Sequence, residues 1–432
     1  MAGPPTHKSP RGHAGRLVLI GGFGALLLTV PSQGTAHARP AHNAAGTRWT
    51  ATWAASPTAA AATGLSATGL SDQTVRDVVH TSVGGWMLRI RLTNRYGDRP
   101  VTFDDMSVGI ADGAALVHGV RITFGGRPAV TIPAGADVAS DAVRLTVGPQ
   151  EKVAVSLHAP GPTGPASWHS AAHTTSYVAV GDHAGDLSGD AFTTRVTSWY
   201  FLDGVDVLAS PRDGTIVALG DSITDGTGTA LDSDTRWTDD LARRIDGGPP
   251  GGRASVVNAG IGGNEVTLDR QPAYFGVSAL HRLDADVLAQ PGVSAVIVFE
   301  GVNDLTAGAV PATRLIAGLR QVADRVHAAR LPVIGATITP CGGYPVCGAQ
   351  VEEQRRLVNA WIRTSGVFDA VLDFDSVVRD PAKTDALQAG FDSGDHLHPN
   401  AAAYQAMADT IDLRTLAHLS GAGPRDTGQH LT

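Results

Sequence analysis

A serine, a histidine and an aspartate in the second half of this 432-residue sequence have the types and spacing needed for acyl transfer. Ser222 lies in GDSITDG, residues 220–226, directly after the apolar run 215–219. His398 lies in DHLHPN, with Asp395 three residues before it. A serine hydroxyl is a poor nucleophile until a base takes its proton, and a carboxylate must hold that base in one tautomer. We therefore expect Ser222 to attack, His398 to act as base and Asp395 to orient it.

Acyl transfer also needs hydrogen-bond donors aimed at the oxyanion that develops on the carbonyl. NAGIGG, residues 258–263, ends in Gly263, and EGVND, residues 300–304, contains Asn303. A loop amide that approaches a ligand closely favours glycine, which has no side chain in the way. We expect the backbone amides of Ser222 and Gly263 and the side-chain amide of Asn303 to form the oxyanion hole.

The elements that must position these residues alternate between strand and helix after residue 211. Because the apolar runs are nearly continuous, they predict a parallel sheet covered by helices on both faces. In a doubly wound sheet the ligand crevice lies beyond the carboxyl ends of the strands, where the polar clusters fall. The predicted strands are residues 215–220, 254–260, 293–301, 331–340 and 368–374, and the predicted helices are residues 236–245, 277–289, 313–330, 352–365 and 400–413.

The first half of the chain has a different pattern, of short strands separated by turn residues. Leu88, Ile90 and Leu92 alternate with polar residues, as in a half-buried strand, and a turn follows at residues 94–98. Many such segments between residues 48 and about 208 predict a β-sandwich or jelly-roll. The predicted fold is therefore α/β, with an all-β domain before a doubly wound domain.

Four blocks of the second half resemble the ordered motifs of the SGNH, or GDSL-type, serine hydrolases. They are Gly220-Asp221-Ser222-Ile223, Asn258-Ala259-Gly260-Ile261-Gly262-Gly263, Gly301-Val302-Asn303-Asp304 and Asp395-His396-Leu397-His398. The resemblance covers roughly residues 213 to 415, and Ile223 stands where leucine is commoner. It implies a carboxylic ester hydrolase with catalytic Ser222, Asp395 and His398, an oxyanion hole of Ser222, Gly263 and Asn303, and no metal or organic cofactor.

The substrate is open between three interpretations. A β-rich half before a GDSL-type domain resembles secreted xylan-esterase-like enzymes, which implies a small ester or an acylated polysaccharide that loses short acyl groups such as acetyl. A lipase or lysophospholipase for longer chains is the alternative, and the loop Thr267–Ser278 could shape its acyl pocket through Tyr274 and Phe275 or be a packed crossover. A carbohydrate-binding protein with a vestigial hydrolase domain would use exposed aromatic residues of the first half, for which the candidates are Trp53, Trp86, Trp168, Trp199 and Tyr200.

The amino-terminal residues have the features of a secretory signal. Lys8, Arg11 and Arg16 precede an apolar stretch, Leu17–Val30, which is too short to span a bilayer, and an A-x-A site ends at residue 38. We expect a secreted, extracellular protein without a stable membrane anchor. The expected organisation is a signal peptide (1–38), a flexible lead (39–47), a β-rich domain (48–210), a hydrolase domain (211–416) and a polar tail (417–432).

Net charge and the absence of certain motifs exclude other classes. The formal net charge is −8 with acids and bases interspersed, whereas a nucleic-acid surface needs a basic patch. Gly-rich phosphate loops are absent from the sequence. Cys341 and Cys347, in CGGYPVCG, are the only cysteines, and an exported chain favours a local disulfide between them. Two free thiols or half of a metal site are the alternatives.

Several polar residues beside the motifs have two interpretations each. His396 could join His398 in a metal site, but no third ligand pattern is visible, so a supporting or solvent-facing role is favoured. Asp225, Asp304 and Glu300 could touch substrate, but helix capping or loop bracing is the favoured role for each.

Overall fold

The structure is a computed structural model that describes residue 3 and residues 48–209, 214–248 and 254–421. Apart from Gly3, the expected signal peptide and flexible lead lie outside the described residues, as does most of the expected polar tail. Cleavage after residue 38 therefore stays a prediction.

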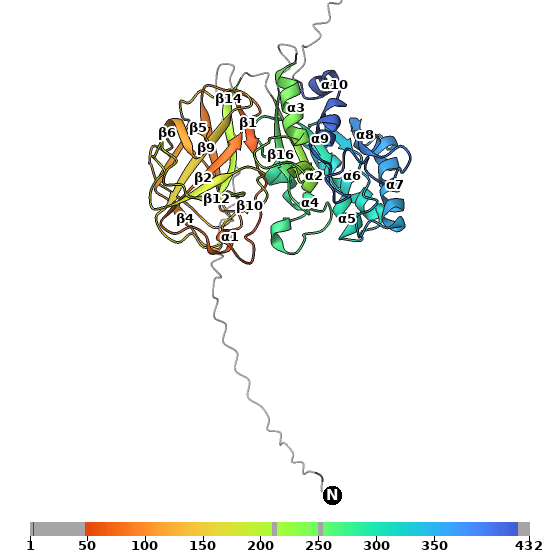
Figure 1. The fold of residues 1–432 in the computed structure, drawn as a ribbon, viewed down its shortest axis with the longest axis horizontal. Helices are drawn as coiled ribbons and strands as arrows, with labels where there is room; N and C mark the ends of the chain where they lie inside the picture. Colours follow the sequence, from red (N-terminus) through yellow and green to blue (C-terminus); the bar gives the residue numbers. More distant parts are fainter. Residues whose placement is uncertain (1–2, 4–47, 210–213, 249–253, 422–432) are drawn as a thin grey trace, which may run out of the picture. The chain divides into compact units, whose positions relative to one another are not determined.

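The first half contains two antiparallel sheets, as Figure 1 shows. The six-stranded sheet has the order β12 (Thr194–Val196), β11 (Ser176–Val180), β2 (Gln73–His80), β9 (Lys152–Ala159), β5 (Asp105–Asp112), β6 (Ala115–Arg121). The four-stranded sheet has the order β1 (Arg48–Ala54), β14 (Leu202–Ala209), β3 (Leu88–Thr93), β8 (Asp137–Ala139). Smaller elements are the helix α1 (Leu65–Thr68) and the pairs β10 (Trp168–His169) with β13 (Trp199–Tyr200) and β4 (Val101–Phe103) with β7 (Val130–Ile132).

Strand β3 illustrates why these segments form a sandwich. Leu88, Ile90 and Leu92 are fully buried in a core to which strands of both sheets contribute. The intervening Arg89 and Arg91 point to the other face and pair with Asp206 of β14 at 2.8 and 3.1 Å. An alternating strand can bury only one face, and the second sheet covers that face. The predicted sandwich is confirmed.

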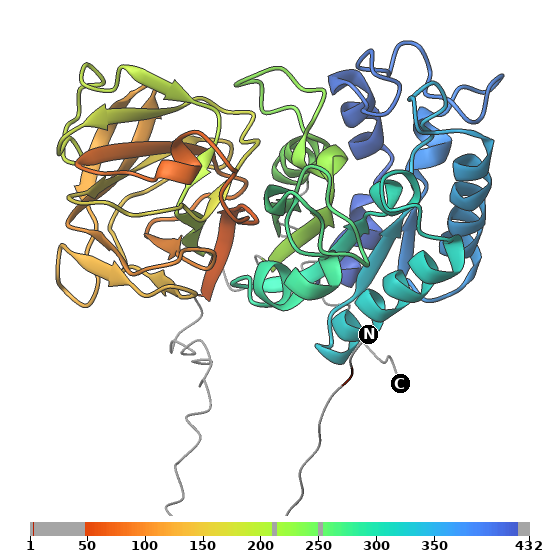
Figure 2. The same ribbon diagram turned by 90° about the horizontal axis from the view of Figure 1, so that it is seen from below.

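The second half is built on a five-stranded parallel sheet (Figure 2). Its order is β16 (Ala254–Gly260), β15 (Gly214–Gly220), β17 (Val293–Phe299), β18 (Val333–Ala336), β19 (Ala370–Leu372). The chain reverses its direction of progress across the sheet between β15 and β17, so their carboxyl ends flank a topological switch point. The predicted doubly wound fold is confirmed.

Helices connect the strands. The long helices are α3 (Trp237–Asp246), α6 (Ala312–Ala328), α7 (Ala349–Thr364) and α9 (Ala401–Asp409). The short ones are α2 (Ser222–Asp225), α4 (Ala279–Arg282), α5 (Val302–Thr306), α8 (Phe374–Val378), α10 (Leu413–Leu419), the 3-10 helix η1 (Ala273–Phe275) and the π-helix η2 (Leu283–Leu288). Two groups pack together: α9 contacts α3 and α8, and α6 contacts α4 and α7, with α5 against α7.

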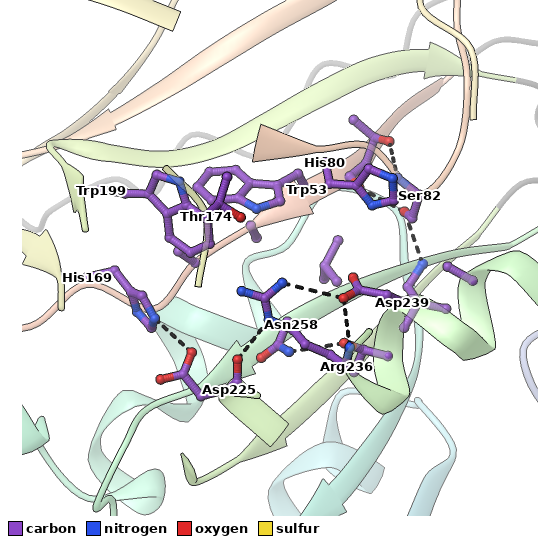
Figure 3. Close-up of a pocket in the computed structure, with 17 residues that line it drawn as sticks. Trp53, His80, Ser82, His169, Thr174, Trp199, Asp225, Arg236, Asp239 and Asn258 are labelled. Carbon is purple, nitrogen blue, oxygen red and sulfur yellow. Dashed lines mark hydrogen bonds and ion pairs between the residues drawn. The ribbon is translucent and has the colours of Figure 1, made fainter. Parts of the chain in front are cut away.

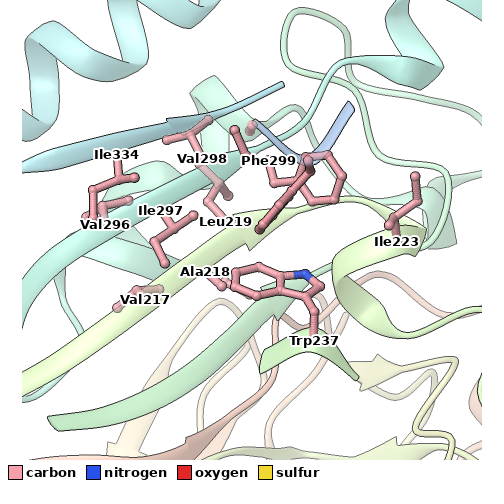
Figure 4. Packing of buried hydrophobic residues seen from close by; sticks show 14 of the residues in the cluster. Val217, Ala218, Leu219, Ile223, Trp237, Val296, Ile297, Val298, Phe299 and Ile334 are labelled. Carbon is pink, nitrogen blue, oxygen red and sulfur yellow. The ribbon is translucent and has the colours of Figure 1, made fainter. Parts of the chain in front are cut away.

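The core of the parallel sheet explains its apolar strands. All residues of β15 are buried, and Trp237 of α3 packs edge to face on Phe374, which in turn contacts Phe299 of β17 (Figure 4). Burial of one large apolar side chain contributes about 1.5–3 kcal/mol, so this cluster anchors the strand that carries the serine motif.

Strand β1 of the sandwich also contacts β16, the edge strand of the parallel sheet. The amide of Ala51 donates to the carbonyl of Pro291 at 3.0 Å, and the hydroxyl of Ser255 donates to the carbonyl of Ala51 at 2.5 Å. Ala51 and Ala54 belong to the apolar core of the α/β half. The two halves therefore share a packed interface beside the strand that leads to the second motif.

Candidate active site

Ser222 is the first residue of α2, directly beyond the carboxyl end of β15. Asp221 is extended and caps the helix by accepting from the amide of Ile223 at 2.9 Å. The amide of a first helical residue has no acceptor within its own helix. The chain therefore presents the hydroxyl and the amide of Ser222 at the same strand end.

His398 links Ser222 to Asp395. Its Nε2 is 2.8 Å from Oγ of Ser222, and its Nδ1 is 2.5 Å from Oδ2 of Asp395. Oδ1 of Asp395 accepts from the amides of Leu397 at 2.9 Å and His398 at 2.8 Å. Burial raises the pKa of Asp395, but the hydrogen bonds from His398 and these amides outweigh it and lower the pKa to about 2. Asp395 is a carboxylate at neutral pH, so Nδ1 carries the proton and Nε2 is free to accept.

The three expected oxyanion donors come from three strand ends. Gly263 has a φ of +78°, and a Cβ there would lie 2.5 Å from Cδ1 of Phe275, so only glycine fits. Nδ2 of Asn303 in α5 is buried and has no hydrogen-bond acceptor among the described residues. A buried donor without an acceptor is costly, and an oxyanion would satisfy it.

A pair of buried carboxyl groups lies beneath the serine turn. Glu300 follows β17, is 2% exposed and lies beside Asp221. Burial, and then the neighbouring Asp221, raise the pKa of Glu300 well above its usual range. Burial also raises the pKa of Asp221, to about 6, although the amide of Ile223 and Glu300 oppose the shift. Burial and the neighbouring Asp221 therefore favour the protonated form of Glu300.

We predict that Glu300→Gln retains hydrolysis at pH 7 within about threefold, because an uncharged amide of similar shape replaces a carboxyl group whose protonated form is favoured by burial. Folding raises the pKa of Glu300. The protonated carboxyl group therefore contributes to the stability of the folded protein below about pH 4.3, the pKa of an unperturbed glutamate. This contribution is lost as the pH rises toward the pKa of Glu300 in the folded protein. The glutamine of the variant does not titrate, so the variant does not lose this stability. The free energy of unfolding of the variant, relative to that of the wild type, should therefore increase between pH 5 and pH 8. Denaturant unfolding at both pH values measures the difference. Glu353→Gln, at an exposed position, is the control, and an equal gain there would contradict the assignment.

The other polar residues of the motifs brace loops in the structure. Asp304 accepts from the amides of Val266 at 2.8 Å and Thr267 at 3.1 Å, which fixes the loop after Gly263. Asp225 accepts from the amide of Gly262 at 3.2 Å. These contacts favour the bracing interpretation over direct substrate contact.

His396 and the cysteines have roles away from the serine. Nδ1 of His396 is 2.5 Å from Oδ2 of Asp392, and its side chain is 55% exposed. Both ring nitrogens of His398 are engaged by Ser222 and Asp395, so a metal shared with His396 has no free ligand on His398. Cys341 and Cys347 form a disulfide, as expected.

The aromatic candidates of the first half mostly pack inside it. Trp53, Trp199 and Tyr200 are buried, and Trp168 donates its indole N–H to the carbonyl of Ala59 at 2.9 Å. Trp86 alone among these candidates is exposed, at 49%. An isolated exposed tryptophan is no platform for a polysaccharide chain, so the structure gives the binding-only interpretation little support.

Sequence reasoning missed three buried cations around the site. Arg282 of α4 donates to the carbonyls of Gly220 at 2.9 Å and Ala259 at 2.7 Å, and so ties two strand ends together. Arg236 donates to the carbonyl of Asp225 at 2.7 Å, and His169 of the sandwich faces the carboxylate of Asp225. None lies in a motif, and no periodic pattern distinguishes them from surface residues.

A serine linked through histidine to a carboxylate, at the switch point of a doubly wound sheet, is the arrangement of a serine hydrolase. Residues 218–406 match the sequence profile of the GDSL-like Lipase/Acylhydrolase family. The C-terminal half of the chain is therefore a GDSL-like acylhydrolase domain of the SGNH type, from a family of carboxylic ester hydrolases.

Solved structures of bacterial enzymes are similar to about half of the chain. A GDSL-like lipase from Bacteroides thetaiotaomicron is 19% identical, with 49% of this chain and 92% of that chain covered and a TM-score of 0.37. A lipase/acylhydrolase from Enterococcus faecalis is 22% identical, with 48% and 96% covered and a TM-score of 0.36. A carbohydrate acetylesterase family member from Sinorhizobium meliloti is 16% identical, with 48% and 99% covered and a TM-score of 0.38. Comparison with curated proteins gave no significant match.

In residues 48–209, 214–248 and 254–421, no helix combines the length and the apolar character needed to cross a bilayer.

Proposed function

We propose that the chain is a secreted serine esterase that removes short acyl groups, acetyl in particular, from carbohydrate through Ser222, His398 and Asp395. The observation that carries the catalytic assignment is the continuous hydrogen-bonded path from Oγ of Ser222 through His398 to Asp395, at 2.8 and 2.5 Å. The secretory features of residues 1–38 and the disulfide support export.

The mechanism follows from the proton positions. Nε2 of His398 takes the proton of Ser222 as Oγ attacks the ester carbonyl, and the imidazolium is stabilised by the carboxylate of Asp395. The tetrahedral intermediate collapses, the C–O bond to the alcohol breaks, and His398 returns the proton to the leaving oxygen. Water, deprotonated by the same histidine, then attacks the acyl-enzyme, and the acid departs as Ser222 regains its proton.

The oxyanion is held by the amides of Ser222 and Gly263 and by Nδ2 of Asn303. Donors fixed before the reaction stabilise the developing charge without reorganisation, and a single such donor is worth about 10²–10³-fold in kcat. The unsatisfied Nδ2 of Asn303 supports its assignment.

Polar neighbours of Gly263 favour a short acyl group. Arg270 donates to the carbonyl of Gly263 at 2.7 Å, stacks on Phe275 and lies 3.7 Å from Glu265. Burial, and then Asp304, raise the pKa of Glu265 to about 7. A long alkyl chain laid along this side would remove water from Arg270 without replacing its hydrogen bonds, which is unfavourable. Arg270, stacked on Phe275, therefore favours a short acyl group on this side of Gly263.

Acyl preference tests this function directly. We expect kcat/KM on nitrophenyl esters to fall from acetyl to long-chain substrates by about tenfold or more, and acetate to be released from acetylated xylan. The Ser222→Ala variant is the blank for both assays. A preference for long acyl chains would identify a lipase instead, and retention on xylan without any hydrolysis would identify a binding protein.

A further inference from the structure

The sandwich half supplies a charged partner to the helix that carries the serine. Nε2 of His169, in β10, is 2.9 Å from Oδ1 of Asp225, the last residue of α2 (Figure 3). Each of the two side chains is only 4% exposed. The two residues are 56 positions apart in the sequence, so the contact exists only because the two halves pack together.

The surroundings of His169 fix its charge. Its Nδ1 is 2.9 Å from the carbonyl oxygen of Ser56, which can only accept, and its Nε2 faces the carboxylate of Asp225. A neutral imidazole has a single N–H and cannot donate to both. Burial lowers the pKa of His169, but Asp225 and the carbonyl of Ser56 together outweigh it, and the net shift is upward. Trp199, whose ring centre is 5.3 Å from that of His169, covers the ring.

The same carboxylate reaches the second motif. Oδ2 of Asp225 accepts from the amide of Gly262 at 3.2 Å, and Gly262 precedes Gly263. The amide of Asp225 donates to the carbonyl of Asp221 at 2.9 Å. Burial raises the pKa of Asp225, but His169, with smaller contributions from His173 and Arg236, outweighs it and lowers the pKa, so the group is a carboxylate at neutral pH. Asp225 therefore joins the serine turn to the Gly262-Gly263 loop.

We propose that His169 is a positioning residue, which holds Asp225 ionised and turned toward Gly262 and thereby fixes the spacing of the Ser222 and Gly263 amides. The sandwich half is then part of the catalytic apparatus. This inference rests on the proposed function, because the spacing matters only if both amides bind the oxyanion. Donors must lie within about 2.7–3.1 Å of that oxygen.

A ligand site is the other role that these residues suggest, because His169, Asp225, Trp53 and Trp199 line a cavity between the halves. The cavity measures about 40 Å³. Sites for small molecules usually measure about 300–1,000 Å³, so this space is too small for a substrate. The residues around it serve packing and charge pairing.

The test compares His169→Gln with His158→Gln in the full-length protein. His158 is a matched control because it is buried, and its Nδ1 lies 2.7 Å from Asp104 within the sandwich. We expect His169→Gln to lower kcat on nitrophenyl acetate by about 10–100-fold with KM within about twofold, since small displacements of positioned groups cost this much. His158→Gln should keep kcat within about twofold of the wild type.

A second variant separates positioning from folding. His169→Gln leaves Asp225 as a buried carboxylate without its cation, whereas the double variant with Asp225→Asn pairs two neutral amides and keeps an acceptor for Gly262. We expect the kcat of the double variant to be at least about tenfold higher than the kcat of His169→Gln alone. The double variant also lacks the buried unpaired charge, so it tests the inference where the single variant does not fold.

The rate of labelling of Ser222 by a fluorophosphonate gives a readout that does not depend on the ester chosen. The inference would be overturned if His169→Gln kept the kcat and the labelling rate of the wild type, or if the two histidine variants lost kcat equally. The proposed function would still stand in either case, provided that the wild type is labelled at Ser222. An absence of labelling in the wild type would overturn both. No recovery in the double variant would also contradict positioning through Asp225.

Discussion

Ser222→Ala should lower kcat for ester hydrolysis by about 10⁶-fold, the loss expected when the nucleophile of a serine hydrolase is removed. The methyl group of alanine cannot form the acyl-enzyme, and the oxyanion donors alone leave about 10³–10⁴-fold over the uncatalysed reaction. Steady-state hydrolysis of nitrophenyl acetate measures the loss. His398 keeps its bond to Asp395 in the variant, so the loop that carries them should hold its conformation.

The control for this prediction is Ser294→Ala at the amino end of β17. The hydroxyl of Ser294 donates to the carbonyl of Thr215 at 3.2 Å, at the opposite end of the sheet from Ser222. Removing it should leave kcat within about twofold, with any change confined to the unfolding midpoint. If Ser222→Ala kept about 1% of wild-type kcat or more, another group would have to be the nucleophile.

The architecture of the parallel sheet could be predicted because its strands are buried on both faces. Such strands are continuous apolar runs, and polar clusters directly after them mark the carboxyl edge. The helical segments were less accurate. Residues 277–289 predict one helix, but the structure has α4 followed by the π-helix η2, a geometry that 3.6-residue periodicity does not encode.

The last predicted helix was also wrong in its extent. Residues 400–413 predict one helix, whereas α9 ends at Asp409 and α10 begins after Asp412, whose carboxylate caps the amides of Arg414 and Thr415. An aspartate before a helical segment is a typical N-cap, so the start of a new helix after Asp412 could have been predicted from the sequence. Helix α10 runs to Leu419, beyond the expected end of the hydrolase domain at residue 416.

Some residues of the candidate site can be recognised in the sequence, whereas others are identified only by contacts that form in the folded protein. Ser222, His398 and Asp395 could be predicted because each lies in a short segment whose residue types suit one reaction. His169 could not, because its partner Asp225 lies in the other half, and neither residue has a local pattern that requires the contact. Arg282 likewise binds carbonyl groups of two strands, and backbone acceptors leave no trace in a sequence.

Asp395→Asn should lower kcat by about 10⁴-fold while the protein stays folded, because the amide favours the wrong tautomer of His398. Oδ1 of Asp395 already accepts from the amides of Leu397 and His398, so the oxygen of asparagine will stay there. Its NH₂ group then takes the place of Oδ2 and faces Nδ1 of His398. The proton moves to Nε2, which can no longer accept from Ser222.

Asp392→Asn in the same loop separates this effect from loop stability. Asp392 accepts from the amides of Gly394 and His396 with Oδ1 and faces Nδ1 of His396 with Oδ2, at 2.8, 3.0 and 2.5 Å. The substitution makes the same chemical change at a histidine that does not contact the serine, so kcat should stay within about threefold. Similar losses in the two variants would mean that both carboxylates only hold the loop, whereas a loss confined to Asp395→Asn ties that carboxylate to the proton on His398.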